Sequence, residues 1–493
     1  MALPDYFGRN AVAVSQAISG LDELTLHARL EDVVVGIRFG PDAKTSEGAA
    51  LADLLTRLLA RLYPRLSLRS AGAPKVTRDM EDLARRINPL IDLGGVPTIE
   101  VIVGTPPRLD ASPRTRIFVG SNNWEGHVAT TGPLRCGTTP NPVGPGLAAC
   151  LAAANVFRYI FLPNPQLDTH ATLSPLEESE VHAASLGPGL SLGNVVLVGA
   201  GAIGNAAAWT LARAPLEGVV HIVDHEDVDL GNLQRYVLAE RTHVAATKAP
   251  LLAQYFGGAL EAKPFCTDLA TYLQDHGYDT RRMLLALDSA QDRRAAQASL
   301  PQWIANAWTQ PGDVGISTHD FARGACVSCL YLPDGPQLNE DDIIARAFGI
   351  PNRVREVRSL LFLGEGAPRG LLDAIAEAHH VDLDRLLPFE GRPLRSLYVE
   401  GFCGGAVIAL DQAGTPRGDV HVPLAHQSAL AGVLLAAAAL RNAFGGACQS
   451  RISQINLLKA LPALHSRPAA KHPSGRCICQ DSDYQQVYAQ KYA

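Results

Sequence analysis

The sequence lacks a run of basic residues, and it lacks any apolar run long enough to cross a bilayer. Its 493 residues carry 43 Lys and Arg against 49 Asp and Glu, a net charge of −6. This balance gives no electrostatic footprint for nucleic acid, which we do not expect as a partner. The longest apolar run, Leu430–Leu440, is shorter than the roughly 20 residues that a membrane-spanning helix needs. It predicts a buried helix, and we expect no membrane association.

The beginning of the sequence also lacks the charged-then-apolar layout of a secretory signal, which predicts a cytoplasmic protein. Nine cysteines are few for a chain of this length. Without a signal they favour free thiols, metal binding or catalysis over a disulfide framework.

Glycines cluster at one informative place. An apolar strand (Val195–Val198) leads into Gly199, Gly201 and Gly204, an Ala-rich segment follows, and a second apolar strand ends in Asp224. The glycines permit a tight turn against phosphate, and the N-terminus of the following helix offers free N–H groups to an anion. An acid at the end of the second strand can hold ribose hydroxyls. This pattern predicts a nucleotide site.

The residues after Asp224 separate ATP from a dinucleotide. Arg235 and Lys248 follow it, and Asp288 comes after a third apolar strand, Met283–Leu287. A dehydrogenase would show the same glycines and acid, but the two cations would then have no role. Cations neutralise charge that builds up on a triphosphate, and an acid such as Asp288 can hold Mg²⁺. The pattern therefore favours ATP with Mg²⁺.

This order of residues resembles the adenylating domain of the ThiF/MoeB and ubiquitin-activating enzyme superfamily. The matching positions are Gly199, Gly201, Gly204, Asp224, Asn232, Arg235, Lys248 and Asp288. The sequence departs from the family pattern at two positions. Tyr236 stands where the family usually has Gln, and Ser289 replaces the Asn of its T-D-N segment. Neither change removes a charged residue, so the prediction of an ATP site stands. The resemblance covers roughly residues 193–334 and, more loosely, the C-terminal third.

The resemblance implies an α/β protein with a Rossmann-like ThiF-type adenylation domain, a degenerate second α/β lobe and a helical insert. The expected parts are the inactive, adenylation-like lobe (1–185), the active adenylation domain (192–334), the helical insert or lid (335–396), and a crossover with a core helix and a metal tail (397–493). An unrelated α/β domain remains the alternative for the first lobe, and 163–189 is expected to be a linker. After the insert we expect strands at 397–400 and 406–410, a helix at 428–444 and a strand at 453–458.

Two short cysteine pairs predict a zinc site. Cys326 and Cys329 form a C-x-x-C, and Cys477 and Cys479 form a C-x-C. Together they offer the four sulfurs of a tetrahedral structural Zn²⁺. MoeB-like proteins carry two C-x-x-C pairs in these places, so the shorter second pair is a departure. The alternative is that the first pair alternates along a strand edge as small apolar residues.

Cys403 is the expected nucleophile. Two glycines follow it, which suits a thiol that must meet a large acyl donor. The ubiquitin-activating family places its catalytic cysteine in or near a crossover leading to a helix, as here. The alternative is a small buried residue in a Gly-rich turn.

The implied reaction is adenylation of the C-terminal carboxylate of a ubiquitin-like protein, with Arg235, Lys248 and Asp288 acting on the phosphates and Cys403 forming a thioester. The thioester would pass to a conjugating enzyme. The chain resembles activating enzymes of bacterial ubiquitin-like conjugation operons, some of which serve antiphage defence. Two arrangements remain open: two chains form a homodimer, or the N-terminal lobe takes the place of a second subunit. The alternatives are adenylation for sulfur transfer or peptide modification without an enzyme thioester, and a non-catalytic scaffold, which the intact charged residues disfavour.

Overall fold

The computed structural model describes residues 6–18, 23–109, 115–162, 164–176, 186–187, 189–310, 313–332, 339–398, 422–445, 449–460 and 463–493. The chain forms two compact units. The main unit combines Met1–Leu332 with Pro423–Ala493, and the helical insert comprises Pro333–Val422. Each is described by itself.

The first lobe of the main unit is built on a six-stranded sheet in the order β2-β1-β3-β4-β5-β6. Strands β1 to β4 are parallel, whereas β5 and β6 are antiparallel to their neighbours. The strands are β1 (Val35–Phe39), β2 (Leu66–Ser70), β3 (Ile99–Val103), β4 (Thr115–Asn122), β5 (Glu125–Ala129) and β6 (His170–Leu173). The helices are α1 (Phe7–Ala17), α2 (Glu23–Asp32), α3 (Ser46–Leu62), α4 (Pro74–Ile87) and α5 (Val143–Phe161).

The second lobe has an eight-stranded sheet in the order β14-β13-β12-β11-β10-β7-β8-β9. Strands β7 to β11 are parallel and β12 to β14 antiparallel. The strands are β7 (Leu190–Val198), β8 (Leu216–Val223), β9 (Leu260–Phe265), β10 (Arg282–Leu285), β11 (Trp303–Gln310), β12 (Asp313–Asp320), β13 (Arg451–Ile455) and β14 (His465–Pro468). The helices are α7 (Ala202–Leu211), α8 (Lys248–Ala253), α9 (Leu269–His276), α10 (Ala290–Ala298), α11 (Ser328–Tyr331), α16 (Ala425–Ala443) and α17 (Ser482–Lys491).

The two lobes follow the same path through space. In each, the first strand lies inside the sheet, the second pairs on one side of it, the chain returns to the other side, and antiparallel strands complete the sheet. Each also places a 19-residue helix between two of its antiparallel strands, α5 in the first lobe and α16 in the second. The described part of the first lobe has no counterpart of β9.

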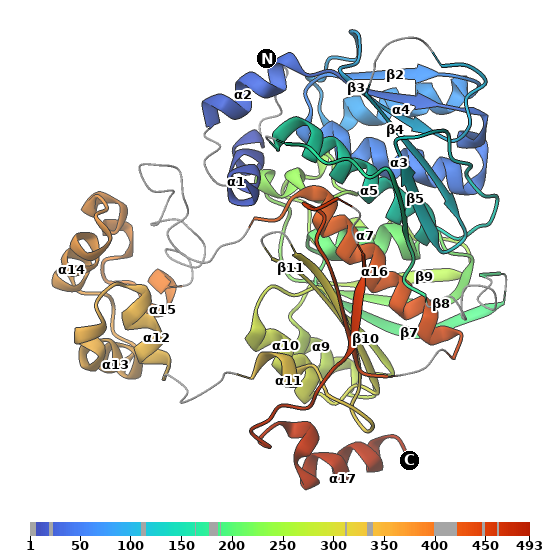
Figure 1. Ribbon diagram of the computed structural model, residues 1–493. Helices are drawn as coiled ribbons and strands as arrows, with labels where there is room; N and C mark the ends of the chain where they lie inside the picture. The colour runs from blue at the N-terminus through green and yellow to red at the C-terminus, as the bar shows by residue number, and fades with distance from the viewer. Residues whose placement is uncertain are drawn as a thin grey trace. The chain divides into compact units, whose positions relative to one another are not determined.

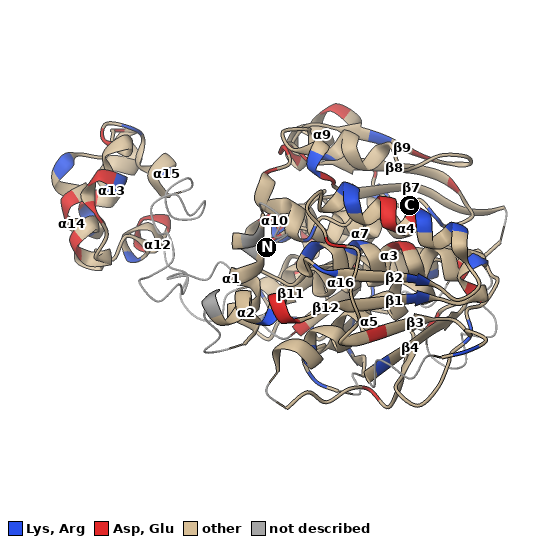
Figure 2. Cartoon of the chain, turned by 90° about the horizontal axis from the view of Figure 1, so that it is seen from above, with Lys and Arg blue, Asp and Glu red and all other residues tan. Residues whose placement is uncertain are grey.

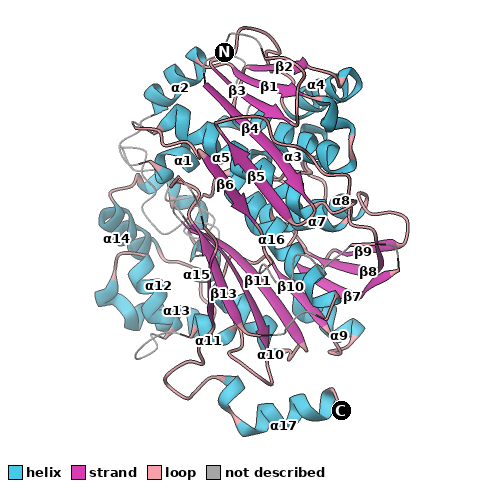
Figure 3. Ribbon diagram, turned by 45° about the vertical axis from the view of Figure 1, so that its right-hand side comes forward, coloured by secondary structure: helices cyan, strands magenta, loops and turns pink. Residues whose placement is uncertain are grey.

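Helices fill the space between the two sheets (Figures 1 and 3). Helix α5 contacts α3, β4 and β5, helix α16 contacts α7, β11 and β12, and α5 and α16 contact each other. Small side chains allow this close packing: a Cβ on Gly432 of α16 would lie 2.3 Å from the carbonyl oxygen of Ile203. The apolar run around Leu430–Leu440 is therefore a buried helix, as predicted from the sequence.

One described helix, α5, is long and apolar enough to cross a membrane by composition alone. It is the core helix of the first lobe, and 89% of its apolar window is buried inside the protein.

A buried ion pair ties α5 to distant segments. Arg158 and Asp168 are 1% and 0% exposed, and their Nη2 and Oδ2 atoms lie 2.7 Å apart. Arg158 also donates to the carbonyl oxygen of Leu457, just after β13. The segment expected to be a linker, 163–189, therefore takes part in the fold. It contains Asp168 of this ion pair and strand β6, which pairs with the edge strand β5.

The insert is helical, as the sequence predicts. It contains α12 (Glu340–Ala347), α13 (Val354–Leu363), α14 (Arg369–His379) and α15 (Leu394–Ser396), with acidic and basic residues interspersed along the longer helices (Figure 2). These helices enclose an apolar core of their own that includes Phe348, Leu371 and Ile375.

One expectation at the end of the insert is wrong. Leu397, expected to begin a strand, continues the helical turn of α15. Its side chain is 0% exposed in the apolar core of the insert, and this packing holds the segment against the helices. Residues 406–410 lie outside the described part of the chain.

Candidate active site

The glycine turn between β7 and α7 has no room for side chains. Gly199 has a φ of +94°, and a Cβ on it would lie 2.5 Å from the carbonyl oxygen of Ala286. A Cβ on Gly204 would lie 2.1 Å from the carbonyl oxygen of Gly199. Gly201 is the N-cap of α7, and the first N–H groups of a helix have no acceptor within that helix. Such a turn suits phosphate, and phosphate binding here stays a prediction.

Asp224 follows β8 at the same edge of the sheet. Its Oδ2 atom accepts a hydrogen bond of 2.6 Å from the N–H of Ala200, and its Oδ1 atom accepts one of 2.9 Å from the N–H of Glu226. The carboxylate is therefore held beside the turn, and its remaining lone pairs can accept from hydroxyl groups of a ligand.

Lys248, the first residue of α8, is buried beside the turn with 5% exposure. Its Nζ atom pairs with the Glu226 carboxylate and lies 5.5 Å from the ring centre of Tyr236. Burial works to lower the pKa of Lys248, but Tyr236, Glu226 and Asp224 outweigh it, and the pKa is raised. The side chain is therefore a cation at neutral pH.

Tyr236 connects this lysine to the glycine turn. Its hydroxyl group lies 3.5 Å from the position of a Cβ on Gly201, and the side chain is 4% exposed. Burial raises the pKa of Tyr236, so the phenol keeps its proton. Sequence comparison marks this residue only as a departure; the structure makes it part of the site.

The other predicted residues lie around the same edge. The guanidinium carbon of Arg235 lies 5.8 Å from the ring centre of Tyr236. The side-chain oxygen of Asn232 accepts from the N–H of Asp229, so Asn232 shapes the short 3-10 helix, Leu230–Gln234, that precedes Arg235. Asp288 is exposed in the loop after β10. A lone carboxylate fits Mg²⁺, which keeps waters and takes further ligands from phosphates.

Two arginines of the first lobe reach into this site, and nothing in the local sequence points to them. Arg61 of α3 is 0% exposed, and its Nη2 atom donates to the carbonyl oxygens of Tyr236 and Ala239 at 2.5 and 2.6 Å. Arg57 donates to the carbonyl oxygen of Val237 at 2.9 Å. Burial lowers the pKa of Arg61 to about 10, so it remains charged at neutral pH.

An acid beside these arginines balances part of their charge. Asp53 accepts from Arg57 at 2.9 Å and from two residues of the second lobe, Trp209 at 2.7 Å and Arg213 at 3.0 Å. Helix α3 therefore fixes residues 236–239, directly after Arg235, from the opposite lobe. We call Arg57 and Arg61 the interlobe arginines.

The four predicted cysteines come together. The Sγ atoms of Cys326 and Cys477 lie 3.4 Å apart, as do those of Cys329 and Cys479, and all four lie within 4.8 Å of one another. Disulfide sulfurs would lie about 2 Å apart, whereas sulfurs about 2.3 Å from a tetrahedral zinc lie roughly 3.8 Å from one another. The donor set and spacing therefore fit Zn²⁺.

The surroundings of the cluster agree with this fit. The first pair lies in a loop and in the short helix α11 and does not alternate along a strand. A cation held by these four sulfurs would tie α17 back onto the second lobe.

Cys403 lies outside the described residues. Among the described cysteines away from the cluster, Cys136 and Cys150 are buried and Cys266 is exposed. Burial, with Asp42 and Glu47 nearby, raises the pKa of Cys136 to about 12, which disfavours a thiolate.

Comparison with known proteins now adds to this geometry. Residues 189–269 match the ThiF family, and residues 40–162 match Prokaryotic E2 family C. The uncharacterized protein y4jF of Sinorhizobium fredii (strain NBRC 101917 / NGR234) is 39% identical over the whole chain and 98% of its own length. The chain belongs to the ThiF/MoeB superfamily. It carries a ThiF-type adenylating domain, and that fold implies an enzyme that binds ATP.

Solved structures are more distant. E. coli MccB is 13% identical with a TM-score of 0.38, covering 72% of this chain and 93% of MccB. E. coli MccB with ATP is 12% identical with a TM-score of 0.37, covering 72% of this chain and 96% of that one. The match to Prokaryotic E2 family C falls within the lobe that we expect to be a degenerate adenylation domain, and that expectation stays a prediction.

The interlobe arginines generate a first prediction. Arg61→Lys keeps the charge but loses the planar fork, which leaves a buried carbonyl oxygen unsatisfied. We expect ATP affinity to fall about tenfold or more, because the chain around Arg235 and Tyr236 shifts, while circular dichroism shows a folded protein. Calorimetric titration with ATP measures this.

Arg86→Gln is the matched control, since Arg86 also reaches the second lobe, at Glu240, but is 54% exposed. Its effect on ATP affinity should be small. Unchanged ATP affinity in Arg61→Lys would show that the fork does not position the site.

The cysteine cluster generates a second prediction. We expect about one zinc per chain by elemental analysis and loss of that zinc in Cys479→Ser, because three thiolates hold the ion less well than four. Hydrogen exchange in α17 should speed up in this variant and after chelation. Cys266→Ser, at an exposed cysteine, should keep its zinc; full zinc in Cys479→Ser would contradict the site.

Proposed function

We propose that this enzyme adenylates the C-terminal carboxylate of a ubiquitin-like protein, captures the acyl group as a thioester on Cys403 and transfers it to a conjugating enzyme. The observation that carries the adenylation step is the convergence of Lys248, Tyr236 and Asp224 on the glycine turn. Lys248 supports this step because it is a cation beside Tyr236, whose hydroxyl group borders the turn.

The chain's own residues account for each electrostatic requirement of adenylation. The N–H groups of the turn and of α7 would bind phosphate oxygens, and Asp224 would accept from the ribose. Lys248 and Arg235 would stabilise charge as the carboxylate oxygen bonds to the α-phosphorus and pyrophosphate leaves. Asp288 would hold Mg²⁺, which supplies charge neutralisation on the phosphates.

The second step moves the acyl group to sulfur. A thiolate attacks the carbonyl carbon of the acyl adenylate, the bond to the AMP oxygen breaks, and AMP leaves with that electron pair. The raised pKa and burial of Cys136 argue against that residue. Cys403 remains our candidate through its place in the sequence.

We also propose that residues 1–185 form a degenerate adenylation-like lobe. The shared strand path of the two lobes supports this proposal. At the place of the glycine turn, the first lobe instead carries Asp42 and the fully buried Glu47. The carboxylate of Glu47 accepts from Ser121 at 2.7 Å and from the N–H of Asn123. Negative charge there opposes phosphate binding.

Such a lobe gives α3 a defined role. It would occupy the place of a second subunit, and its interlobe arginines would complete the site within one chain. The partners are then a ubiquitin-like protein and a conjugating enzyme. We also propose that the enzyme belongs to a bacterial ubiquitin-like conjugation operon of the kind that serves antiphage defence. Its proposed location is the cytoplasm.

Lys248→Ala tests the adenylation site. Removing the cation leaves phosphate charge unneutralised, and we expect ATP binding to weaken at least about tenfold in calorimetric titrations. Lys263→Ala, at an exposed lysine of β9, is the matched control and should bind ATP normally. Tighter binding of NAD than of ATP by the unaltered protein would favour a dehydrogenase and sink the proposal.

Cys403→Ala tests the thioester step. The unaltered enzyme, incubated with ATP, Mg²⁺ and a ubiquitin-like protein ending in glycine encoded in the same genome, should form an adduct that thiol reagents remove. Cys403→Ala should lose this adduct on non-reducing gels while ATP consumption continues, and Cys266→Ala should keep it. An adduct retained in Cys403→Ala would place the nucleophile elsewhere.

A further inference from the structure

Helix α10 begins directly after Asp288 and holds the loop that carries this residue. Ser289 is the N-cap of the helix, and its hydroxyl oxygen accepts from the N–H of Asp292 at 2.9 Å. On the other side of Asp288, Arg293 of the same helix donates through its Nη2 atom to the carbonyl oxygen of Leu287. The exposed carboxylate of Asp288 therefore stands on a stretch of backbone that α10 fixes on both sides.

Two further contacts hold the side chain of Arg293 in the protein interior. It is 6% exposed, and its Nη2 atom also donates to the carbonyl oxygen of Ala307 in β11 at 3.2 Å. Its Nη1 atom donates to the hydroxyl group of Tyr331 at 3.1 Å, and its guanidinium carbon lies 5.0 Å from the centre of that ring. The planar fork thus reaches three oxygen atoms at once, which a lysine ammonium on a flexible stem does not reproduce.

Tyr331 carries this network into the segment of the first cysteine pair. It is the last residue of α11, two residues after Cys329, and its hydroxyl group also accepts from the amide of Asn306 at 3.1 Å. A second contact joins the same segment to α10, because the side-chain oxygen of Gln297 accepts from the N–H of Val327 at 2.9 Å. Buried polar groups are costly to leave unpaired, so these hydrogen bonds hold α10 and α11 in one arrangement.

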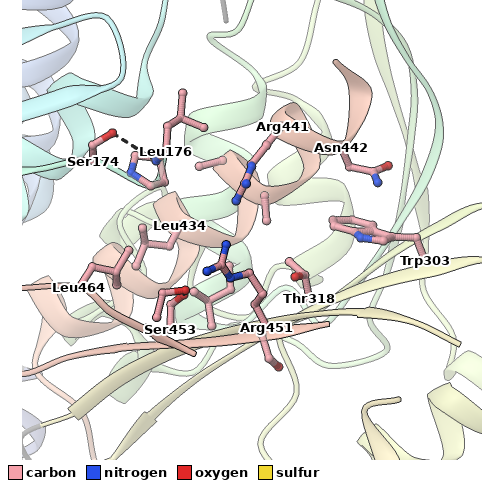
Figure 4. Close-up of a pocket in the computed structure, with 16 residues that line it drawn as sticks. Ser174, Leu176, Trp303, Thr318, Leu434, Arg441, Asn442, Arg451, Ser453 and Leu464 are labelled. Atoms are coloured by element: carbon pink, nitrogen blue, oxygen red, sulfur yellow. Dashed lines mark hydrogen bonds between the residues drawn. The ribbon is translucent and has the colours of Figure 1, made fainter. Parts of the chain in front are cut away.

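The network is distinct from the cavity of the second lobe that Figure 4 shows. That cavity has a volume of about 180 Å³ and lies between α16 and the antiparallel strands. Asn306 donates at 3.2 Å to Ser317, which lines the cavity, but Arg293, Tyr331 and Asp288 are not among the described residues of its lining. Arg293 therefore acts on the loop of Asp288 and not on that cavity.

We propose that Arg293 is a positioning residue for the Mg²⁺-binding carboxylate of Asp288, and that it connects this carboxylate to the cysteine cluster through Tyr331. The inference rests on the proposed function, in which Asp288 holds the Mg²⁺ of bound ATP. Mg²⁺ demands nearly ideal octahedral geometry, so a small displacement of the carboxylate weakens the site. The hydrogen bonds of Arg293 to the described residues reach neither Asp224 nor the glycine turn.

Calorimetric titration with ATP at a series of Mg²⁺ concentrations tests the positioning role. Arg293→Lys keeps the charge but loses the fork, and Tyr331→Phe removes only the hydroxyl group. Each should raise the Mg²⁺ concentration that gives half of the gain in ATP affinity by about fivefold or more, and should leave ATP affinity without Mg²⁺ within about twofold. A merely structural role would lower the melting temperature without shifting the Mg²⁺ requirement.

Arg294→Lys is the matched control. Arg294 is the next residue of α10, and its Nε atom is buried without a hydrogen-bond partner in the described part of the chain. This variant should show the Mg²⁺ requirement of the unaltered protein, because it leaves the contacts around Leu287 and Tyr331 in place.

Asp288→Asn separates failure of this inference from failure of the proposed function. This variant should lose the gain in ATP affinity that Mg²⁺ gives. If the unaltered protein binds no ATP, or if Asp288→Asn keeps the gain, the proposed ATP site is wrong and the inference fails with it. If Asp288→Asn loses the gain but Arg293→Lys has an unchanged Mg²⁺ requirement, the ATP site stands and the positioning role is overturned.

Cys479→Ser tests the connection to the cysteine cluster. Without the ion the segment 326–331 loosens, Tyr331 holds Arg293 less firmly, and the Mg²⁺ requirement should rise in the same direction as in Tyr331→Phe. Hydrogen exchange at residues 287–289 should also speed up, and this measurement needs no ATP. Cys266→Ser should change neither quantity. An unchanged Mg²⁺ requirement in Cys479→Ser protein that has lost its zinc would overturn the connection.

Discussion

The hydrogen bonds from Arg57 and Arg61 to the chain at residues 236–239 are the constraint on which the site depends. They join a helix of one lobe to the backbone that carries Arg235 and Tyr236 in the other. Buried carbonyl oxygens need donors, and here the donors come from about 180 residues earlier in the sequence. The adenylating domain is thus shaped by a lobe that does not contain its glycine turn.

Close packing of helices makes this connection possible. Helices α5 and α16 contact each other between the two sheets, and α3 and α7 pack beside them. Alanine and glycine on these faces bring the backbones near each other, as at Gly432. Because such interfaces are dense, they hold the two lobes at a fixed distance, which a side chain as short as that of Asp53 can bridge.

The sequence predicts what depends on local patterns. The turn at Gly199, the strand ending before Asp224 and the helix around Leu430–Leu440 each follow from spacing and composition within a short window. The convergence of the two cysteine pairs was also predictable, because four sulfurs share one chemistry. These features need no knowledge of how distant segments meet.

Contacts between distant segments could not be read in the same way. Arg61 looks like an ordinary helix residue, and only the lobe arrangement makes it a donor to the site. The sequence predicts a strand from Leu397 onward, yet the core of the insert holds this residue in a helical turn. Strand β6 has only four residues and follows a Pro-rich stretch, which gives too little periodicity to predict a strand.

The order of strands in the second sheet has a consequence for synthesis on the ribosome. Strand β12 ends at Asp320, but its neighbour β13 begins at Arg451, about 130 residues later. At roughly 5–20 residues per second, the growing chain exposes that edge for on the order of ten seconds before its partner emerges. An open strand edge can pair with other chains, so the nascent protein needs protection during this interval.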